Sequence, residues 1–462
     1  MFIDSHCHLS FKDYSPEERE AILARAFEAG VGAFVNIGAG EGVESNDQAV
    51  EFAKSYPQVF ATVGMHPHDA KLVTPEVLKH IEALAKNPKV VALGEVGLDF
   101  HYSHSPHDVQ EKVLVQFLEL AKKLDKPVVI HDRDAGDKTY ELIRQASFSQ
   151  RKVMIHCFTG DRALAKKYLD LGCLLSFTGI ITFKNAEELR EVVKLTPVES
   201  MLIETDSPYL APIPFRGKKN EPAHVVTVAK AIAEQKGLSL SDVERITTLN
   251  ATRFFNLPAA QIQASVVYAI RDSLYLNITN RCTLACTFCP KFIDYEVKGY
   301  YLKLPKEPTV EEVLSQVGDP SKYREVVFCG YGEPTRRLDA LLIIAKNLKS
   351  RFPKLRIRIN TDGLGNLVHQ RNILPELAPF VDALSVSLNA QDAATYARVC
   401  PSKYKEAAYP AVKDFIGEAV KHIPEVVASV VGLPQVDPQA CRKIAEEELG
   451  AKFRFRALDN VG

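Results

Sequence analysis

Apolar, β-prone runs alternate with amphipathic helical stretches along the whole of this chain of 462 residues. Such alternation is typical of consecutive βαβ units, in which neighbouring strands run parallel and helices cover the sheet. The 46% hydrophobic and 25% charged residues supply a sizeable core and exclude a disordered or fibrous chain. No apolar run is long enough to span a bilayer and nothing before Asp4 resembles a signal peptide, so we expect a cytoplasmic protein without membrane contact.

Eight strands are predicted in the first part of the chain, and helical stretches separate them. They cover residues 2–4, 33–37, 60–64, 90–94, 128–130, 153–155, 174–177 and 201–204. Eight strands with their helices in about 255 residues are the content of a TIM (β/α)8 barrel. We therefore expect a barrel domain over residues 1–258.

A second series of strands follows a short segment that we interpret as a linker over residues 259–268. The predicted strands cover residues 274–278, 326–329, 357–360, 383–388, 426–431 and 453–457. Six β/α repeats are fewer than the eight of a closed barrel. The second domain, residues 269–462, is therefore predicted to be a partial (β/α)6 barrel that is open on one side.

Metal-ligating side chains stand at the ends of several strands of the first domain. Imidazoles two residues apart in extended backbone point to the same side, as expected for His6 and His8. Other candidates follow predicted strands four, five, six and eight, where the carboxyl-end rim of a barrel holds its active site. These candidates are Glu95, His131, His156 and Asp206. Four imidazoles and two carboxylates suit two divalent cations with a shared carboxylate, an arrangement that activates water and clamps a phosphodiester.

Six motifs of the first domain resemble those of the TatD-type metal-dependent deoxyribonucleases. They lie at residues 3–9, 64–68, 94–99, 127–131, 156–160 and 204–210. The resemblance implies two divalent ions (Mg, Mn or Zn) and hydrolysis of DNA ends or another nucleotide-type phosphodiester. It assigns one ion to His6, His8 and Asp206, the other to His131 and His156, and the bridge between them to Glu95. Glu95 and Asp206 are then the predicted catalytic residues.

Further polar residues of this domain are predicted to support the site. His66 and His68 are candidates to hold a ligand in place or to face phosphate, and Glu204 is expected to orient a ligand or to join a third metal site. A net charge of −1 lacks the pervasive basicity of proteins that bind long duplex DNA, so contacts with nucleic acid should be local. Arg216 and Lys218, in a loop after Asp206, are the predicted phosphate contacts.

A cysteine triplet marks the second domain. Cys282, Cys286 and Cys289 fall within eight residues, whereas Cys400 and Cys441 stand alone, so a second cluster is not expected. Structural zinc prefers four ligands, and no suitable fourth group is near in the sequence. Three thiolates on a [4Fe-4S] cluster leave one iron open to a further ligand. The triplet therefore predicts an iron–sulfur cluster in which one iron has no protein ligand and can bind a functional one.

The triplet and the segment Cys329–Pro334 together resemble the radical S-adenosylmethionine (SAM) superfamily, over residues 269–462. The resemblance implies that the open iron chelates SAM and that an electron from the cluster cleaves SAM to a 5′-deoxyadenosyl radical. It also implies a reductant protein such as flavodoxin or ferredoxin. The predicted SAM contacts are Gly330, Tyr331, Gly332 and Glu333 in the second motif, with Asn360, Ser385 and Ser387 near later strand ends.

The leading hypothesis is a bifunctional enzyme in which a dinuclear metal phosphodiesterase is fused to a radical SAM catalyst. One alternative makes the first domain a hydrolase of another ester or amide. Another makes the second domain a redox-sensing or scaffold module whose cluster performs no turnover. The segment Gly330–Pro334 favours catalysis, because an inert cluster needs no site for methionine.

Overall fold

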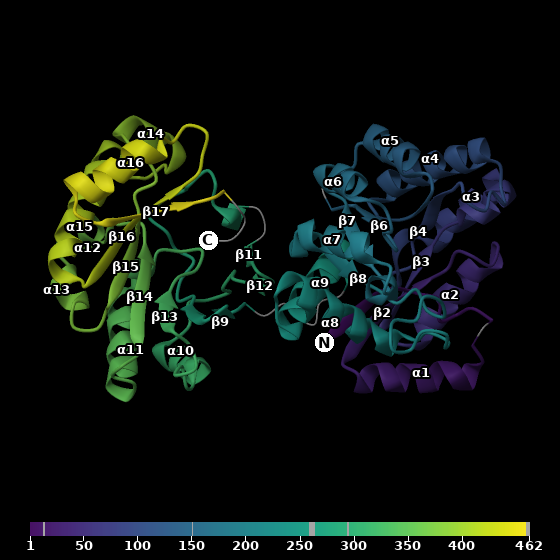
Figure 1. Cartoon of the computed structure of the whole chain (residues 1–462), viewed down its shortest axis with the longest axis horizontal. Coiled ribbons are helices and arrows are strands. Elements are labelled where there is room, and N and C mark those ends of the chain that lie inside the picture. The colour runs from purple at the N-terminus through teal and green to yellow at the C-terminus, as the bar shows by residue number, and fades with distance from the viewer. Residues whose placement is uncertain (13, 150, 258–263, 293–294, 459–462) are drawn as a thin grey trace. The chain divides into compact units, whose positions relative to one another are not determined.

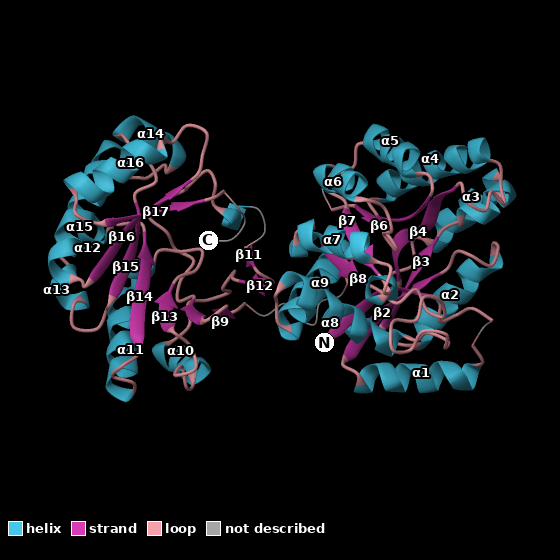
Figure 2. Ribbon diagram, viewed as in Figure 1, coloured by secondary structure: helices cyan, strands magenta, loops and turns pink. Residues whose placement is uncertain are grey.

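The computed structural model describes residues 1–12, 14–149, 151–257, 264–292 and 295–458. The chain divides into two compact units, Met1–Gln261 and Ile262–Gly462. Each unit has its own sheet and its own apolar core, and in each the helices pack against the strands (Figures 1 and 2). None of the described helices is both long and apolar enough to cross a membrane.

The first unit is an eight-stranded parallel sheet in which the strands follow one another in chain order. The strands are β1 (Phe2–Cys7), β2 (Val31–Ile37), β3 (Val59–Val63), β4 (Val90–Asp99), β5 (Val128–Arg133), β6 (Val153–Ile155), β7 (Leu174–Phe177) and β8 (Met201–Ile203). The helices are α1 (Pro16–Glu28), α2 (Glu44–Ser55), α3 (Pro75–Leu84), α4 (His107–Leu124), α5 (Gly136–Ala146), α6 (Arg162–Asp170), α7 (Glu187–Leu195), α8 (Val225–Lys236) and α9 (Leu240–Phe254). All eight predicted strands and the TIM-like fold are confirmed.

The sheet curls until its last strand meets its first. The Asp206 amide donates to the His6 carbonyl at 2.9 Å, and the His8 amide donates to the Ser207 carbonyl at 2.8 Å. Inward apolar side chains of the strands pack with Phe254 at the end of α9 and form a core distinct from the one under the outer helices. Polar side chains therefore collect at the carboxyl ends of the strands.

Three strands run further toward the rim than the sequence predicted. β4 extends to Asp99 and β5 to Arg133 because the rim residues continue the ladder between these two strands. β1 extends to Cys7, which pairs with Asn36 of β2. Gly97 permits this close pairing. Its φ is +154°, and a Cβ at this position would lie 1.9 Å from the His131 carbonyl oxygen, so no other residue fits.

The second unit contains six parallel strands and an antiparallel edge strand. In sheet order they are β17 (Lys452–Arg456), β16 (Glu425–Val431), β15 (Ala383–Ser387), β14 (Arg356–Thr361), β13 (Glu325–Phe328), β10 (Ser273–Leu276) and β9 (Val267–Ile270). Its helices are α10 (Val310–Val317), α11 (Leu338–Arg351), α12 (Gly365–His369), α13 (Leu374–Leu377), α14 (Ala393–Val399), α15 (Ala408–His422) and α16 (Pro438–Lys443). The predicted (β/α)6 partial barrel is confirmed.

Two features of this unit escaped sequence analysis. The predicted linker ends at residue 268, yet Val267 and Tyr268 already belong to β9, which pairs with β10. Residues 259–263 of the predicted linker lie outside the described part of the chain. A short hairpin of β11 (Glu296–Val297) and β12 (Tyr300–Tyr301) follows the cysteine segment. Strands this short leave little alternation to detect.

Ion pairs occupy the amino-terminal end of this sheet. Glu325, the first residue of β13, accepts from Arg358 at 3.0 Å, and Arg356 at the start of β14 pairs with Glu425 at 2.6 Å. The inward positions further along the strands hold smaller polar side chains, such as Asn360 and Ser385, which border a cavity. The interior of this unit therefore leaves a cavity at the carboxyl ends of its strands, and polar side chains of the sheet form part of its wall.

Candidate metal centre and candidate cofactor cavity

The extended backbone of β1 brings His6 and His8 to one side of the strand. Their Nε2 atoms lie 3.3 Å apart, and they lie 3.5 and 3.4 Å from Oδ1 of Asp206. Asp206 reaches them from the turn that follows β8, with its backbone at a φ of +53°. Two imidazole nitrogens facing one carboxylate oxygen at these distances form a convergent donor set.

Glu95 lies at the centre of the cluster and is almost fully buried. Its Oε1 lies 2.6 Å from His131 Nδ1, 3.2 Å from His156 Nε2 and 3.6 Å from His66 Nε2. Its Oε2 lies 3.5 Å from His6 Nε2. Burial opposes ionisation, but the surrounding imidazoles, His156 and His66 above all, hold the pKa of Glu95 well below its usual range. Glu95 is therefore an anion shared by several nitrogen donors.

Glu204 orients His156 from the side opposite to Glu95. It accepts from His156 Nδ1 at 3.0 Å, from the Cys157 amide at 2.7 Å and from the Ser176 hydroxyl at 2.6 Å. With Nδ1 occupied in this way, Nε2 of His156 faces Glu95. Carboxylates commonly fix the tautomer of metal-binding histidines by this arrangement.

Asp99 is a buried acceptor that sequence analysis did not single out. Its Oδ2 lies 2.9 Å from His68 Nε2 and 3.2 Å from His131 Nε2. Burial opposes the charge on His131, but hydrogen bonds with Asp99 and Glu95 raise its pKa to about 9. Asp99 stands at the end of the matching motif at 94–99, and its place at the end of a strand is the signal that could have identified it.

The donor atoms fit divalent cations. Three sets of ligand atoms each lie within 4.8 Å of one another: His6, His156 and Asp206; His6, His8 and Glu95; His66, Glu95 and His131. Imidazole nitrogens and carboxylate oxygens are the ligands of Zn²⁺ and Mn²⁺ sites. The cluster of buried titratable groups therefore supplies the ligand atoms that a divalent cation requires.

The sets differ in part from the implied distribution of ligands. Glu95 belongs to two sets, in keeping with a bridging role. His156, however, stacks on the His6 ring at 3.7 Å, whereas its ring centre lies 6.0 Å from that of His131. His66, to which sequence analysis gave only a supporting role, stands in a ligand set. The assignment of each ligand to one ion stays a prediction.

The two predicted phosphate contacts lie on the exposed loop between β8 and α8. Arg216 and Lys218 are both exposed, and the Arg216 guanidinium lies over the Phe183 ring at 4.1 Å. An aromatic face beneath a guanidinium holds it in place without removing its charge. Both cations thus stay available to an anion.

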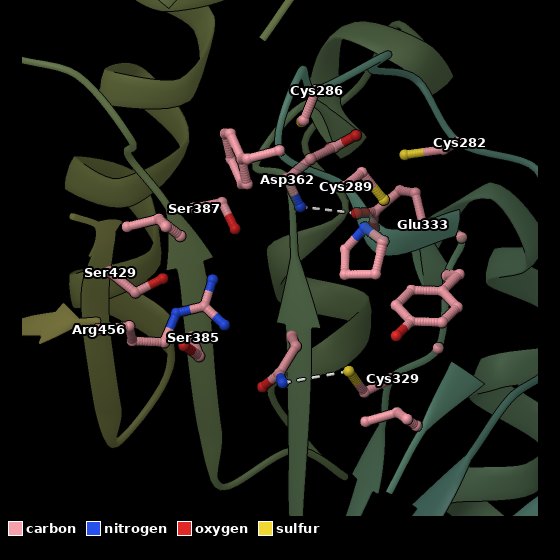
Figure 3. A pocket seen from close by; sticks show the side chains of 18 of the residues that line it. Cys282, Cys286, Cys289, Cys329, Glu333, Asp362, Ser385, Ser387, Ser429 and Arg456 are labelled. Carbon is pink, nitrogen blue, oxygen red and sulfur yellow. Dashed lines mark hydrogen bonds between the residues drawn. The ribbon is translucent and has the colours of Figure 1, made fainter. Parts of the chain in front are cut away.

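The cysteine triplet of the second unit borders a cavity of about 240 Å³ at the carboxyl ends of the strands (Figure 3). All three cysteines line it. The seven predicted SAM contacts also line it: Gly330, Tyr331, Gly332, Glu333, Asn360, Ser385 and Ser387. Residues from four strand ends or loops thus meet around one space, which matches the need for a cluster and a ligand side by side.

The three thiols of the triplet fit a metal cluster, since metals bind thiolates. All three are free and partly buried. Burial raises the pKa of Cys282 to about 12 and raises the pKa of Cys289 as well. A neighbouring thiol and burial together raise the pKa of Cys286. Thiols of this kind stay protonated until a metal displaces the proton, because the thiolate is the ligand.

Glu333 has a structural contact set in addition to its place in the cavity wall. Its Oε1 accepts from the Thr335 amide and from the hydroxyls of Thr335 and Thr361, and its Oε2 accepts from the Asp362 amide at 2.6 Å. The dashed line between Glu333 and Asp362 in Figure 3 marks the last of these contacts. The carboxylate therefore ties the turn after β13 to the end of β14.

The glycines of the same motif have a packing role. A Cβ on Gly330 would lie 2.3 Å from Asn277 Oδ1, and a Cβ on Gly332 would lie 2.2 Å from the Thr279 carbonyl. The turn can approach the segment after β10 only without side chains at these positions. Its backbone consequently stays at the cavity wall.

Several lining residues were missed by sequence analysis. Asp362 lies beside the cysteines, and Ser429 and Arg456 lie opposite them beside Ser385 (Figure 3). Strand alternation puts Ser429 and Arg456 on the inner face, but no local motif marks them. Only the assembled sheet shows that they share a cavity with the triplet.

Comparison with known proteins assigns both halves. The family model described as TatD related DNase matches residues 3–256. The chain belongs to this TatD family. The metal-dependent hydrolase YabD of Bacillus subtilis is 39% identical over 257 residues, which are 56% of this chain and 100% of YabD. YcfH of Escherichia coli K12, also a metal-dependent hydrolase, is 36% identical over 266 residues, 57% of this chain and 99% of YcfH. Both carry "uncharacterized" in their names.

A solved structure supports the same assignment. YJJV, a TatD homologue from Escherichia coli K12, superposes with a TM-score of 0.53 at 30% identity and covers 56% of this chain and 98% of its own.

The family model of the radical SAM superfamily matches residues 276–447. A TatD-family hydrolase domain and a radical SAM domain are therefore joined in this chain.

Proposed function

We propose that the TatD-family domain hydrolyses phosphodiester bonds at DNA ends with two divalent cations. The observation that carries this proposal is the buried carboxylate Glu95, surrounded by four imidazoles at the rim of the barrel. When bound, the cations would activate water and neutralise charge on the scissile phosphate. The exposed Arg216 and Lys218 would add local contacts with phosphate.

Each protein residue has a defined task in this proposal. Glu95, which belongs to two donor sets, and Asp206, which belongs to one, would hold the cations, and the cations would supply the activated water. Glu204 keeps Nδ1 of His156 engaged, so that Nε2 stays available as a ligand. Asp99 instead engages Nε2 of His131, so that Nδ1 of His131 faces Glu95.

Removing the central carboxylate tests the proposal. Glu95→Ala or Asp206→Asn should lower metal-dependent exonuclease activity on linear DNA by at least about a hundredfold, because metal-activated water is lost. Asp137→Asn, at an exposed carboxylate, is the matched control and should retain wild-type rates. Near wild-type, metal-dependent rates in the Glu95 variant would disprove the assignment. Wild-type hydrolysis of ester or amide substrates without DNA cleavage would favour the other hydrolase class.

We propose that the radical SAM domain binds one [4Fe-4S] cluster on Cys282, Cys286 and Cys289 and SAM in the adjoining cavity. The observation that carries this proposal is the shared cavity, which the triplet and the Gly330–Glu333 turn border together. When bound, a reduced cluster would supply the electron that cleaves SAM. The electron would come from a reductant protein such as flavodoxin or ferredoxin.

Residues of the chain would position SAM and the substrate. The backbone of the turn at Gly330–Glu333 lies at the cavity wall, where it can receive the methionyl amino group. Asn360, Ser385 and Ser387 offer neutral polar groups for the ribose or the carboxylate. The cation of Arg456 gives the opposite wall a positive charge (Figure 3).

Anaerobic reconstitution separates a catalyst from a scaffold. Wild-type protein loaded with iron and sulfide should hold about four irons, and Cys286→Ala should lose most of them. Cys441→Ala, at a buried cysteine on α16, is the control and should load normally. With SAM and dithionite the loaded protein should release 5′-deoxyadenosine. Zinc in place of iron, or a cluster without SAM binding, would favour the redox-sensing or scaffold alternative.

A further inference from the structure

The loop that carries the cysteine triplet pairs with a segment more than a hundred residues away. The Ala285 amide donates to the Pro401 carbonyl at 2.8 Å, and the Thr287 amide donates to the Val399 carbonyl at 3.0 Å. An antiparallel bridge joins Leu284 to Ser402 in the same register. These contacts form a short antiparallel ladder outside the main sheet.

This register places Cys286 directly opposite Cys400. The pair lies between the two interstrand hydrogen bonds, which makes it a non-hydrogen-bonded pair. Side chains approach each other most closely at such pairs, where the Cα atoms are about 4.5 Å apart. That separation falls within the range of about 4.4–6.8 Å found in disulfides.

The side chains confirm the closeness of the two thiols. The Sγ atoms of Cys286 and Cys400 lie 3.5 Å apart, and both cysteines are free. Cys400 is buried, with 1% of its surface exposed, and the Asn389 amide group donates to its sulfur at 3.5 Å. Asn389 therefore holds Cys400 in position, while Cys286 borders the cavity through which small oxidants can enter.

We propose that Cys286 and Cys400 form a reversible disulfide whenever the cluster site holds no iron, and that this disulfide blocks cluster assembly. The block rests on the proposed role of Cys286 as a cluster ligand. The disulfide itself rests only on the geometry of the pair. It withdraws one of three ligands, and two thiolates cannot hold the cluster.

Hydrogen peroxide supplies the oxidant in a balanced reaction. The Cys286 thiol first loses its proton to water, and the resulting thiolate attacks one oxygen of peroxide. The O–O bond breaks, Cys286 becomes a sulfenic acid, and the departing hydroxide recovers the proton and leaves as water. The Cys400 sulfur then attacks the oxidised sulfur, and the second water leaves. In sum, two S–H bonds break, one S–S bond forms, and two electrons and two protons pass to the two oxygens of peroxide. A dithiol reverses the change by thiol–disulfide exchange.

Peptide mapping tests the disulfide on full-length protein that has been stripped of iron without oxygen. After hydrogen peroxide, the number of alkylated thiols should fall by two, and the fragments with Cys286 and Cys400 should be linked. Cys400→Ser should show no such link, whereas Cys441→Ser should behave as wild type. A link from Cys286 to Cys282 or Cys289 instead, or peroxide-treated wild type in which both thiols stay alkylatable, would overturn the proposal.

Iron loading tests the consequence. Oxidised wild type should take up less than about a tenth of the iron of reduced protein, and dithiothreitol should restore loading. Cys400→Ser should load iron equally with or without peroxide. Loss of loading in Cys400→Ser at the same peroxide dose would overturn the block. If Cys400→Ser does not fold, the mapped link in wild type still decides the disulfide. Neither readout requires SAM cleavage, so failure of the proposed radical chemistry would be seen separately.

Discussion

Replacing Glu204 by glutamine tests whether this buried carboxylate sets the position of His156. Glu204 accepts from the imidazole, from the Cys157 amide and from the Ser176 hydroxyl. Glutamine has the same shape, and its carbonyl oxygen can keep both N–H donors. Its amide can donate to the Ser176 oxygen, because a hydroxyl turns to accept. The barrel should therefore stay folded, and only the negative charge is lost.

The size of the effect follows from the bond to His156, because the bond from the Cys157 amide is the same with and without a cation. A hydrogen bond to a charged group contributes about 1.5–3 kcal/mol and a neutral one about 0.5–1.5 kcal/mol, so the His156 bond weakens by about 1 kcal/mol. This loss corresponds to an affinity about fivefold lower for the cation that His156 faces. Groups that orient metal ligands typically contribute about 10–100-fold, so about fivefold is the smallest loss expected.

Equilibrium dialysis of the full-length chain against Mn²⁺, with metal analysis, measures this affinity. Circular dichroism checks that the fold is retained. Glu187→Gln, at an exposed position on α7, is the matched control and should bind as wild type. A folded Glu204→Gln variant with an affinity within about threefold of wild type would refute the claim that Glu204 prepares His156 for metal.

Three further predictions concern other buried carboxylates. Asp99→Asn should lower metal-dependent phosphodiesterase activity about 10–100-fold, measured with bis-p-nitrophenyl phosphate, and an unchanged rate would contradict its role. Glu333→Gln sets an amide N–H₂ against the Asp362 amide and should destabilise the radical SAM domain by about 1–3 kcal/mol in thermal unfolding; unaltered unfolding would argue against it. Burial raises the pKa of Glu325, but hydrogen bonds from Arg358 outweigh burial and hold this pKa below 4.5. The ion pair therefore stabilises the fold above about pH 4.5, and this stabilisation is lost as the pH falls through the pKa of Glu325 in the folded protein. In urea unfolding, Glu325→Gln should therefore lose less stability than wild type between about pH 5 and pH 3, and equal losses would exclude this pair as a source of acid sensitivity.

Much of the barrel fold and part of its site could be predicted from local patterns. Strand and helix periodicities repeat along the chain, and parallel strands place their carboxyl ends on one rim, so the proximity of His6 to Glu95 follows from topology. The spacing of His6 and His8 similarly determines that both imidazoles face one side of β1. The topology and the backbone thus place these residues on one rim and on one face of a strand.

Which side chains touch each other was decided only by the closed structure. The stacking of His156 on His6, the place of His66 beside Glu95 and the support from Asp99 all depend on strand register and on the pitch of the rim. A register shift of one residue would turn each side chain to the other face. The sequence shows that these residues exist but contains no local signal for their pairing.

The second domain shows the same division. The Cys282–Cys289 spacing and the Gly330–Pro334 segment predict a cluster and its ligand from local sequence alone. Cys400, which stands alone in the sequence, lies 3.5 Å from Cys286 because a ladder between distant segments aligns the two. Spacing along the chain determines contacts within one loop, whereas contacts across more than a hundred residues require the folded backbone, since only folding fixes their register.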